Sequence, residues 1–458
     1  MDNKCITSEA ECVEEGVSRE MNREVDEIAK KQIGGDIKIV QEIVEGNFPR
    51  LWEATDACLS VCATLFLNDL TNPVGINLLG PPSCGKTTVL SFFYEVPYCY
   101  KSDHFTPASF VSHSVNVKKK DLAKIDMLPK IKDRIMIIPE LAPVFSKRKE
   151  YLEENIGVLI RVFDGQGFQS DTGAQGRRGY SGEHLFAWLG ATTPLPYRVW
   201  QTMGKLGSRW LFMLMPKELA FEEQQDLEVD DLINNVTYKD KVNQCREVIG
   251  NYLNVLFEKY KWHIDKESGK VKVGHKIEWD RKVDKEHIRS IVSIAQLVAR
   301  ARSTVSIWTE KGDSDEAYSY AQPIKEVPSR LKSILYNLAR GHAIIHQRTR
   351  LSEDDVIFVT RIALSSMQDD RREVMRLLLR EGTVDTNMIC DRLRVEERSA
   401  RSIMRALEVL GVASMYQEGP GSSYHSELSS DFQIFRDDTG SLYGLVMEIV
   451  GERTKESV

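Results

Sequence analysis

Residues 75–90 read GINLLGPPSCGKTTVL, and this stretch decides the fold. An apolar run of strand character leads into the pattern G-x-x-x-x-G-K-[ST], and a helical pattern follows it. Glycines let such a loop wrap closely, so that its backbone N–H groups face phosphate oxygens. The stretch therefore predicts a strand, a phosphate-binding loop and a helix in that order, with ATP and Mg²⁺ as the cofactors.

The loop combines a backbone cradle with two side chains that have separate roles. Lys86 is expected to bridge the β- and γ-phosphates, and the hydroxyl of Thr87 is expected to ligate Mg²⁺. The nucleotide-binding residues that the pattern predicts are Gly80, Pro81, Pro82, Ser83, Cys84, Gly85, Lys86, Thr87 and Thr88.

Length and composition are those of a globular protein with more than one domain. The chain has 458 residues, of which 42% are apolar and 28% charged, enough for roughly two to four domains. No apolar run approaches the roughly 20 residues that span a bilayer. The acidic N-terminus lacks the basic-then-apolar order of a signal peptide. We expect a cytoplasmic protein with no membrane partner.

The net charge bears on nucleic-acid binding, and the cysteine spacing bears on zinc binding. A net charge of −7 argues against a protein coated in nucleic acid, but it leaves room for DNA binding through a local basic patch. Cys58 and Cys62 are four residues apart, and no second cysteine or histidine pair follows at zinc spacing. The eight cysteines are therefore expected to be free thiols.

Short apolar runs alternate with helical stretches between residues 75 and 215. That alternation predicts an α/β core with a parallel sheet and crossover helices. The strands are expected in GINLLG (75–80), SFVSHSV (109–115), RIMIIPE (134–140), HLFAWLGATT (184–193) and RWLFMLMP (209–216).

Pattern changes divide the chain into four ranges. Residues 1–45 read as an acidic helical segment, and 46–216 as the nucleotide-binding core. Helical periodicity dominates 217–370, which is expected to form an α-helical lid. Residues 371–458 form a separate C-terminal module with short helices and many turn formers.

Two later strands carry candidate hydrolysis residues at their carboxyl ends. RIMIIPE is expected beside the phosphate-loop strand, with Glu140 as the general base that polarises a water. Pro139 stands where an aspartate would assist the Mg²⁺ shell, so active but slow hydrolysis is expected. The strand 184–193 ends in Thr193, whose hydroxyl can bond the attacking water or the γ-phosphate.

An arginine precedes the next apolar run, in KLGSRWLFMLMP (205–216). Arg209 is expected on an edge that faces a neighbouring subunit, where an arginine stabilises the charge of the transition state. The order of phosphate loop, MIIPE, GATT and GSRW resembles an AAA+ ATPase. GATTPLP followed by LGSRWLF is similar to the sensor 1 and arginine-finger stretch of RuvB-type motors.

A second part of this resemblance lies in the lid. VPSRLKSILYNLARGHAIIHQRTRLSEDDV (327–356) resembles the sensor 2 helix of MoxR-type and minichromosome-maintenance ATPases. In those families an arginine near the start of this helix contacts the γ-phosphate from the lid. The resemblance assigns that role to Arg330, with Arg289 as a rival.

A glycine-rich segment, DTGAQGRRGYSG (171–182), predicts a β-hairpin with Arg177 and Arg178 at or near its tip. Minichromosome-maintenance-like ATPases carry a hairpin in this position that faces a central pore and touches DNA. The resemblance therefore implies phosphate contacts for both arginines. A solvated turn and a subunit contact are the alternatives.

The C-terminal module has three helical segments followed by a strand, a loop and a return strand. This order resembles a winged helix-turn-helix domain, whose third helix enters the major groove. That helix is expected over 397–410, with Arg398, Arg401 and Arg405 at helical spacing on one side. The same module also suits an adaptor for a protein partner.

The leading hypothesis is an ATP-hydrolysing AAA+ motor that acts on DNA as a ring, expected to be hexameric. Helicase, translocase and loader activities all fit this pattern. Two alternatives stay open. The first is a MoxR-like chaperone or remodeller of a protein complex, and the second is a slow ATP-gated assembly switch.

Overall fold

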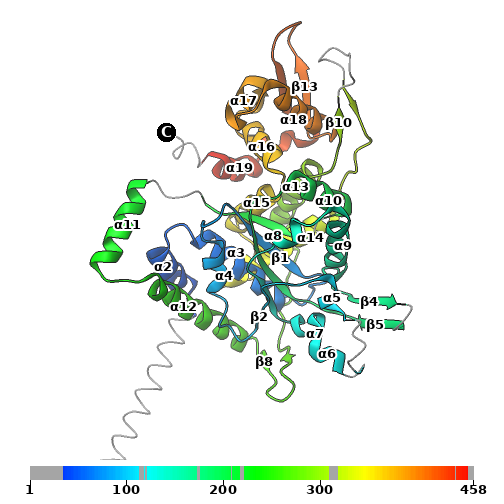
Figure 1. Cartoon of the computed structure of the whole chain (residues 1–458). Coiled ribbons are helices and arrows are strands. Elements are labelled where there is room, and N and C mark those ends of the chain that lie inside the picture. The colour runs from blue at the N-terminus through cyan, green and yellow to red at the C-terminus, as the bar shows by residue number, and fades with distance from the viewer. Residues whose placement is uncertain are drawn as a thin grey trace, which may run out of the picture. The chain divides into compact units, whose positions relative to one another are not determined.

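The computed structural model describes residues 35–112, 118, 121–172, 176–207, 209–216, 221–308, 318–438 and 440–451 (Figure 1). The chain separates into two compact units, each made of several stretches of sequence. The smaller unit comprises Met1–Trp52, Ser91–Cys99 and Glu218–His275. The larger unit comprises Glu53–Leu90, Tyr100–Lys217 and Lys276–Val458. Among the described helices, none has the length and apolar character needed to cross a membrane.

A five-stranded sheet forms the centre of the larger unit, in the order β2-β3-β6-β1-β7. Parallel pairing joins β1 to β6, β1 to β7 and β3 to β6. The predicted α/β class with a parallel sheet is therefore confirmed. The strands are β1 (Val74–Leu79), β2 (Cys99–Lys101), β3 (Ile135–Ile138), β6 (Ala187–Thr192) and β7 (Leu211–Leu214).

The structure corrects two expectations about this sheet. The second strand is β2 at Cys99–Lys101, whereas the predicted stretch 109–115 begins within helix α5 (Pro107–Phe110) and runs into residues outside the described ranges. A capping box at Thr106 and Ser109, with proline at the first helical position, starts that helix. In addition, β3 does not lie beside β1, because β6 lies between them.

Aromatic side chains fill the core beside the sheet. The ring of Phe163 lies 5.5 Å from that of Trp188 and 5.6 Å from that of Trp210. A Cβ at Gly75 would lie 2.8 Å from the Phe163 ring, so this strand position requires glycine. The helices of this region are α4 (Lys86–Ser91), α5, α6 (Leu122–Ile125), α7 (Met127–Ile131), α8 (Ala142–Phe145), α9 (Lys149–Val162) and α10 (Tyr197–Leu206).

Helices from distant parts of the sequence pack on the β7 side of the sheet. The Ser366 hydroxyl accepts a hydrogen bond from the Phe212 N–H at 2.9 Å, which ties α15 to β7. The helices are α3 (Trp52–Ala63), η1 (Thr64–Phe66), α13 (Lys285–Ala301), α14 (Ser329–Ile345) and α15 (Glu353–Ser365).

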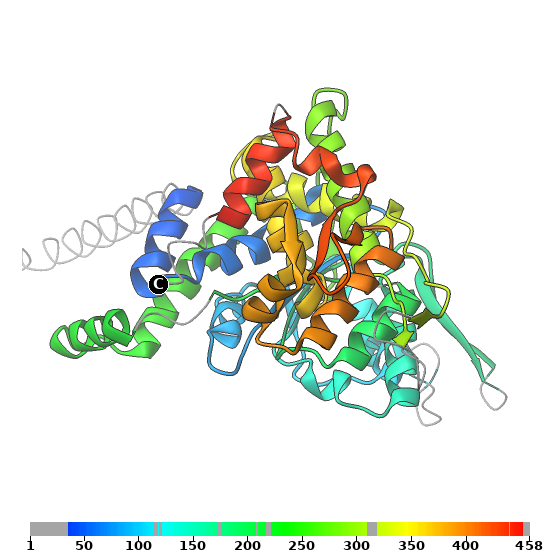
Figure 2. The ribbon, with the colours of Figure 1, turned by 90° about the horizontal axis from the view of Figure 1, so that it is seen from above.

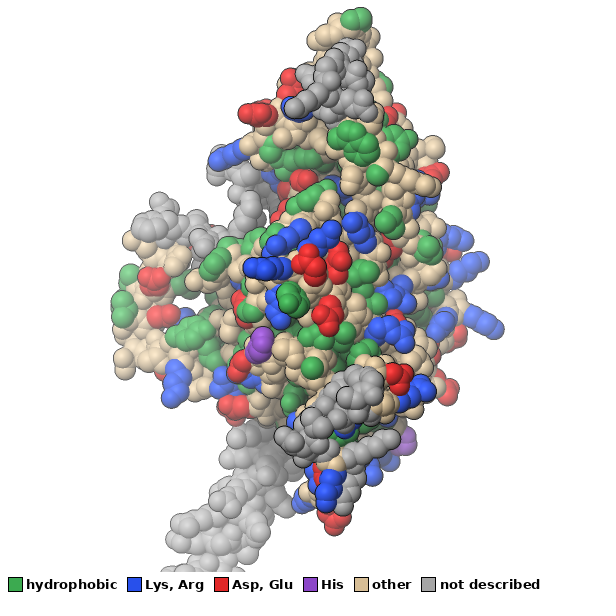
Figure 3. Space-filling view, turned by 45° about the vertical axis from the view of Figure 1, so that its right-hand side comes forward, with side chains coloured by type: hydrophobic (Ala, Val, Ile, Leu, Met, Phe, Trp, Pro, Cys, Tyr) green, Lys and Arg blue, Asp and Glu red, His purple; other side chains and the backbone are tan. Residues whose placement is uncertain are grey.

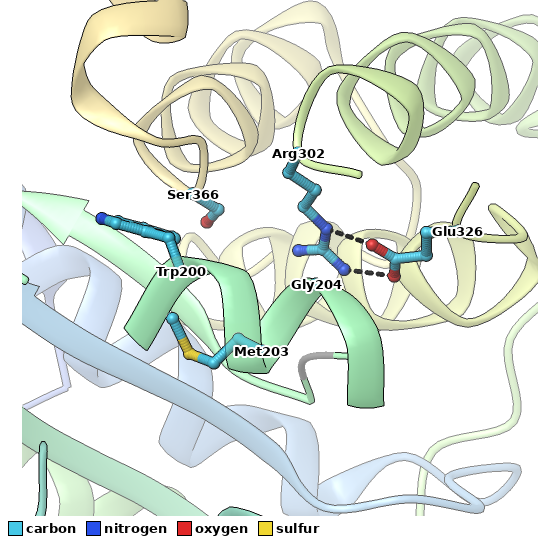
Figure 4. Close-up of a pocket in the computed structure, with 6 residues that line it drawn as sticks. All are labelled: Trp200, Met203, Gly204, Arg302, Glu326 and Ser366. Atoms are coloured by element: carbon cyan, nitrogen blue, oxygen red, sulfur yellow. Dashed lines mark hydrogen bonds and ion pairs between the residues drawn. The ribbon is translucent and has the colours of Figure 1, made fainter. Parts of the chain in front are cut away.

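A small cavity separates α10 from these helices (Figure 4). Trp200, Met203 and Gly204 of α10 line one side of it. On the other side, Arg302 forms a two-point ion pair with Glu326 at 2.6 and 2.5 Å. Both side chains are at least nine-tenths buried. The pair joins the end of α13 to the segment that precedes α14.

The described part of the C-terminal module contains four α-helices, one 3₁₀ helix and a three-stranded antiparallel sheet, with strand order β12-β14-β13. Asp385 caps the second of these helices by accepting the Met388 N–H at 2.8 Å. The elements are α16 (Asp369–Glu381), β12 (Thr383–Asp385), α17 (Thr386–Leu393), α18 (Glu397–Val409), β13 (Ala413–Gln417), β14 (Tyr424–Leu428), η3 (Ser430–Phe435) and α19 (Ser441–Gly451).

Two further hairpins belong to the larger unit. The predicted hairpin is present as β4 (Gly167–Thr172) and β5 (Gly176–Ser181), and it projects outward in both Figure 1 and Figure 2. Its base is anchored where the Tyr180 hydroxyl donates to Asp126 at 2.8 Å. A short hairpin of β10 (Ile307–Trp308) and β11 (Ser319–Tyr320) lies against α18.

The smaller unit is mainly helical. Helix α2 (Ile37–Asn47) packs against α12 (Tyr238–Lys259), and α11 (Phe221–Ile233) precedes α12. The ring of Tyr98 stacks on Phe257 with centroids 3.7 Å apart. A short antiparallel hairpin consists of β8 (His263–Ile264) and β9 (Val271–Lys272).

Candidate nucleotide site

The glycine-rich loop follows directly after β1 and has the backbone needed to curl around an anion. Ser83 and Gly85 both adopt positive φ, at 67° and 86°, and a residue with a side chain pays a conformational cost there. A Cβ at Gly80 would lie 2.6 Å from the Cys84 Sγ, so this position also requires glycine. The loop rim formed by Pro81, Pro82 and Ser83 is exposed.

The ammonium group of Lys86 lies inside this loop. Its Nζ donates to the carbonyl oxygens of Gly80 at 2.8 Å and Pro81 at 2.5 Å, and the residue is 6% exposed. A buried ammonium needs such partners. Thr87, by contrast, is exposed at the start of α4. The lysine is therefore held within the cradle, while the hydroxyl beside it faces outward.

The carboxyl ends of three neighbouring strands bring the other hydrolysis candidates to the same edge. Leu79 of β1 pairs with Thr192 of β6, and Ile138 of β3 pairs with Gly190. Gly80, Thr193 and Glu140 follow these strand ends, and open α/β sheets bind ligands at this edge. The sheet therefore gathers the loop, Glu140 and Thr193 on one side.

Glu140 and Pro139 differ in exposure. The Glu140 side chain is exposed and its Oε1 accepts the Ala142 N–H at 2.8 Å. This bond orients the carboxylate and leaves its second oxygen available to a water. Pro139 is buried and has no oxygen in its side chain to offer a metal ion. Of the expected Mg²⁺ donors, the exposed Thr87 hydroxyl remains.

Arg209 and Arg330 meet at the opposite edge of the sheet. Arg209 precedes β7, which runs parallel to β1, so it lies at the end away from the loop. Its Nε is 3.3 Å from the Oδ1 of Asp164, and the Nη2 of Arg330 is 3.4 Å from that same oxygen. The Asp164 carbonyl accepts a bond from Asn72, just before β1. Neither arginine can reach the loop of its own chain from this edge.

The hairpin arginines lie on β5, close to the turn. Arg177 is exposed and donates to Gln169 across the hairpin. Arg178 is half-buried and lies opposite Ser170. The turn itself, residues 173–175, falls outside the described residues.

The three arginines predicted on α18 have different surroundings. Arg398 is exposed. Arg401 forms an ion pair with Glu397 at 2.5 Å. Arg405 is 6% exposed and its guanidinium lies over the ring of Tyr318, 4.5 Å from the centroid. A buried guanidinium cannot contact DNA, so this placement argues against that role for Arg405.

Sequence reasoning missed Asp164, and it missed a buried cluster at Asp56, His342 and His346. Burial opposes ionisation of Asp56, but the charge of His342 and hydrogen bonds from both histidines outweigh it and lower the pKa of Asp56 to about 2. Burial likewise disfavours protonated His342, but Asp56 and Asp355 raise its pKa to about 9. The spacing H-A-I-I-H (342–346) was the available signal, because it puts two imidazoles on one helix face.

Neither a scan of protein-family models nor a search of curated proteins finds a match for this chain. The geometry of the site therefore carries the functional argument.

Proposed function

We propose that the chain is an AAA+ ATPase that completes each hydrolysis site with residues from a neighbouring copy. One observation carries this proposal: the loop, Glu140 and Thr193 gather at one edge of the sheet, while Arg209 and Arg330 gather at the other. The strand order, with β6 between β1 and β3, supports the same family.

The loop supplies ATP binding and the strand ends supply hydrolysis. Lys86 exchanges its bonds with the Gly80 and Pro81 carbonyls for phosphate oxygens when ATP enters. The exposed Glu140 carboxylate accepts a proton from the attacking water, and the Thr193 hydroxyl orients that water. Glu140 acts from a fixed position because the Ala142 N–H holds one of its oxygens.

The candidate nucleotide site offers few side-chain ligands for Mg²⁺. Mg²⁺ neutralises developing phosphate charge when it is bound. Thr87 is the side chain that would hold it here, because Pro139 offers no ligand. Active but slow hydrolysis follows from this donor set.

Arg209 and Arg330 belong to the face that meets the neighbouring copy in the proposed assembly. Figure 3 shows Lys and Arg side chains gathered, with some acidic ones among them, over the side of α9 and α10. The exposed basic residues of these elements are Arg148, Lys149, Arg161, Arg198 and Lys205. A basic face suits docking beside a neighbour's phosphates. Since both edges repeat on every copy, the contact is head-to-tail and closes into a ring, for which we propose six copies.

DNA is the proposed substrate of the motor. The projecting hairpin with Arg177 and Arg178 supports phosphate contacts in the pore of a ring. The C-terminal module has the element order of a winged helix, with Arg398 exposed on α18. The test is the rate of ATP hydrolysis with and without DNA. We expect DNA to increase the rate, and we expect this increase to disappear as the salt concentration rises.

Protein remodelling is the second candidate, and the surroundings of α18 favour it. Arg405 is covered by Tyr318, and Arg401 is paired with Glu397. Because Arg405 is buried, α18 offers fewer guanidinium groups to DNA than its sequence predicts, and the module then serves as an adaptor for a protein. Hydrolysis that no form of DNA stimulates favours this candidate.

The direct test is Glu140→Gln, with Glu267→Gln, at an exposed carboxylate between β8 and β9, as the matched control. We expect Glu140→Gln to lower kcat by about 10²- to 10⁴-fold while the chain still assembles with ATP in size analysis. Glu267→Gln is expected to hydrolyse ATP as the wild type does. Normal hydrolysis by Glu140→Gln would refute the assignment of the base.

A further inference from the structure

A cluster of two imidazoles and two carboxylates lies away from the nucleotide site. Asp56 comes from α3, His342 from the last turn of α14, His346 from the residue that ends α14, and Asp355 from α15. Asp56 and His342 are at least nine-tenths buried, and the side chain of His346 is 27% exposed. The proposed ATPase cycle uses none of these residues.

The two histidines direct the same ring nitrogen at one carboxylate. The Nε2 of His342 lies 3.1 Å from Oδ2 of Asp56, and the Nε2 of His346 lies 3.3 Å from Oδ1. These ligand atoms all lie within 4.8 Å of one another. Tetrahedral zinc with bonds of about 2.0–2.1 Å separates neighbouring ligand atoms by roughly 3.4 Å. The two nitrogen–oxygen distances are close to that value.

The opposite nitrogen of His342 is already fixed. Its Nδ1 lies 2.5 Å from Oδ1 of Asp355, which Arg348 holds in turn at 2.9 Å. The ring also stacks on Phe358, with centroids 4.2 Å apart and planes tilted by 13°. Metal-binding histidines are oriented in this way, with an outer carboxylate on the far nitrogen.

The donor set of the cluster suits a cation. Asp56 offers two carboxylate oxygens, and each lies within 3.3 Å of an imidazole nitrogen. An imidazole that donates from Nδ1 has a lone pair on Nε2, so a metal ion can take the place of the proton between this nitrogen and the carboxylate. A salt bridge to His342 accounts for one imidazole, and His346 directs a second one at the same carboxylate.

We propose that Asp56, His342 and His346 bind one zinc ion, with Asp355 as the outer ligand that orients His342. Two imidazoles and a carboxylate are a ligand set that zinc accepts, and the partial exposure of His346 lets a water supply the fourth ligand. The ion fastens α3 to the end of α14, two helices far apart in the sequence. It is a structural ion whose binding is independent of ATP.

The experiment uses the full chain, stripped of metal by a chelator and kept free of nucleotide. Cobalt, which occupies zinc sites and absorbs visible light, is titrated first, and zinc is then added while Tm is followed. We expect one ion per chain, a tetrahedral cobalt spectrum without a thiolate charge-transfer band, and a Tm increase of about 5 °C at a hundredfold excess of zinc over Kd.

Variants separate a built site from adventitious binding. His346→Gln removes a partly exposed ligand and is expected to fold without metal, but to lose the cobalt spectrum and the Tm response. Asp355→Asn is expected to bind about 10- to 100-fold more weakly. His104→Gln, an exposed histidine elsewhere, is the control and keeps both responses.

Two results would overturn the proposal. One is a folded wild-type chain that takes up no cobalt and whose Tm is unchanged by zinc, which leaves the cluster as a protonated hydrogen-bond network. The other is uptake that persists unchanged in His346→Gln, which places the ion elsewhere. Neither result bears on ATP hydrolysis, so the proposed function is tested separately.

Discussion

The Nε of Arg209 lies 3.3 Å from Oδ1 of Asp164, and Arg330 contacts the same oxygen. Arg161 lies 3.1 Å from the other oxygen of this carboxylate. Three guanidinium groups thus share one anion at the edge of the sheet opposite the phosphate loop. Without that anion, like charges would drive them apart.

This relationship makes Asp164 a positioning residue for the arginines. We expect Asp164→Asn to lower kcat about 10-fold, because Arg209 and Arg330 lose their shared partner. The KM for ATP is expected to change little, since the loop binds the nucleotide from the other edge. A Glu267→Gln control, at an exposed carboxylate between β8 and β9, should hydrolyse ATP normally. An unchanged kcat in Asp164→Asn would mean that the arginines keep their positions without it.

The proline before Glu140 is expected to limit the metal shell. Replacing Pro139 with Asp puts a carboxylate at the end of β3, and we expect hydrolysis to become faster and to saturate at a lower Mg²⁺ concentration. Pro139→Ala removes the ring without adding a ligand and should keep the original Mg²⁺ requirement. If Pro139→Asp is inactive while Pro139→Ala is active, the buried strand end does not accept a carboxylate as a metal ligand.

The β4–β5 hairpin is expected to contribute phosphate contacts. Changing both Arg177 and Arg178 to Ala should weaken DNA binding at low salt, and should reduce the slope of log K against log salt by about 2. Arg289→Ala, at an exposed arginine on α13, is the control and should leave the slope unchanged. An unchanged slope in the double variant would separate the hairpin from DNA and favour a subunit contact.

A half-buried ion pair supports the helices beside β7. Arg340 has a side chain that is 1% exposed, and its Nη1 lies 2.7 Å from Oδ1 of Asp69. We expect Asp69→Asn to lower the free energy of unfolding by about 2 kcal/mol, less than for a fully buried pair because Asp69 is 36% exposed. Asp103→Asn, at an exposed carboxylate, is the control with little expected effect.

The same pair predicts a pH dependence. Burial opposes ionisation of Asp69, but hydrogen bonds and charge from Arg281 and Arg340 outweigh it and lower its pKa below 3.8. A lowered folded-state pKa stabilises the fold above the unfolded value, and this stability is lost as pH falls. The difference between wild type and Asp69→Asn in denaturant unfolding should therefore shrink below about pH 3.8. A difference that stays constant into acid would exclude the charge of Asp69 as its cause.

Local sequence predicted the elements whose signals are local. The strand, loop and helix of residues 74–91 and the paired strands of the β4–β5 hairpin depend on signals within a few residues, and both were found where expected. The strand β2 was missed because it is three residues long and not fully buried. Its position depends on pairing with β3, which no local pattern encodes.

The parts of the site that depend on long-range packing were not predictable. Asp164 gathers arginines from two distant stretches, and nothing around it marks it as a partner. Arg405 has the same helical spacing as its neighbours, but Tyr318 from another segment buries it. Residue type and spacing identified candidate site residues. Tertiary contacts decide which of those side chains are exposed to a ligand.

Mixing two inactive chains tests the composite site most directly. The Arg209→Ala chain still supplies a loop with Glu140. The Glu140→Gln chain still supplies Arg209 to its neighbour. If the site forms between copies, each variant alone is inactive and a 1:1 mixture regains hydrolysis at roughly one site in four, as random neighbours in a head-to-tail ring require. A mixture as inactive as its parts, although the chains assemble together, would contradict the account.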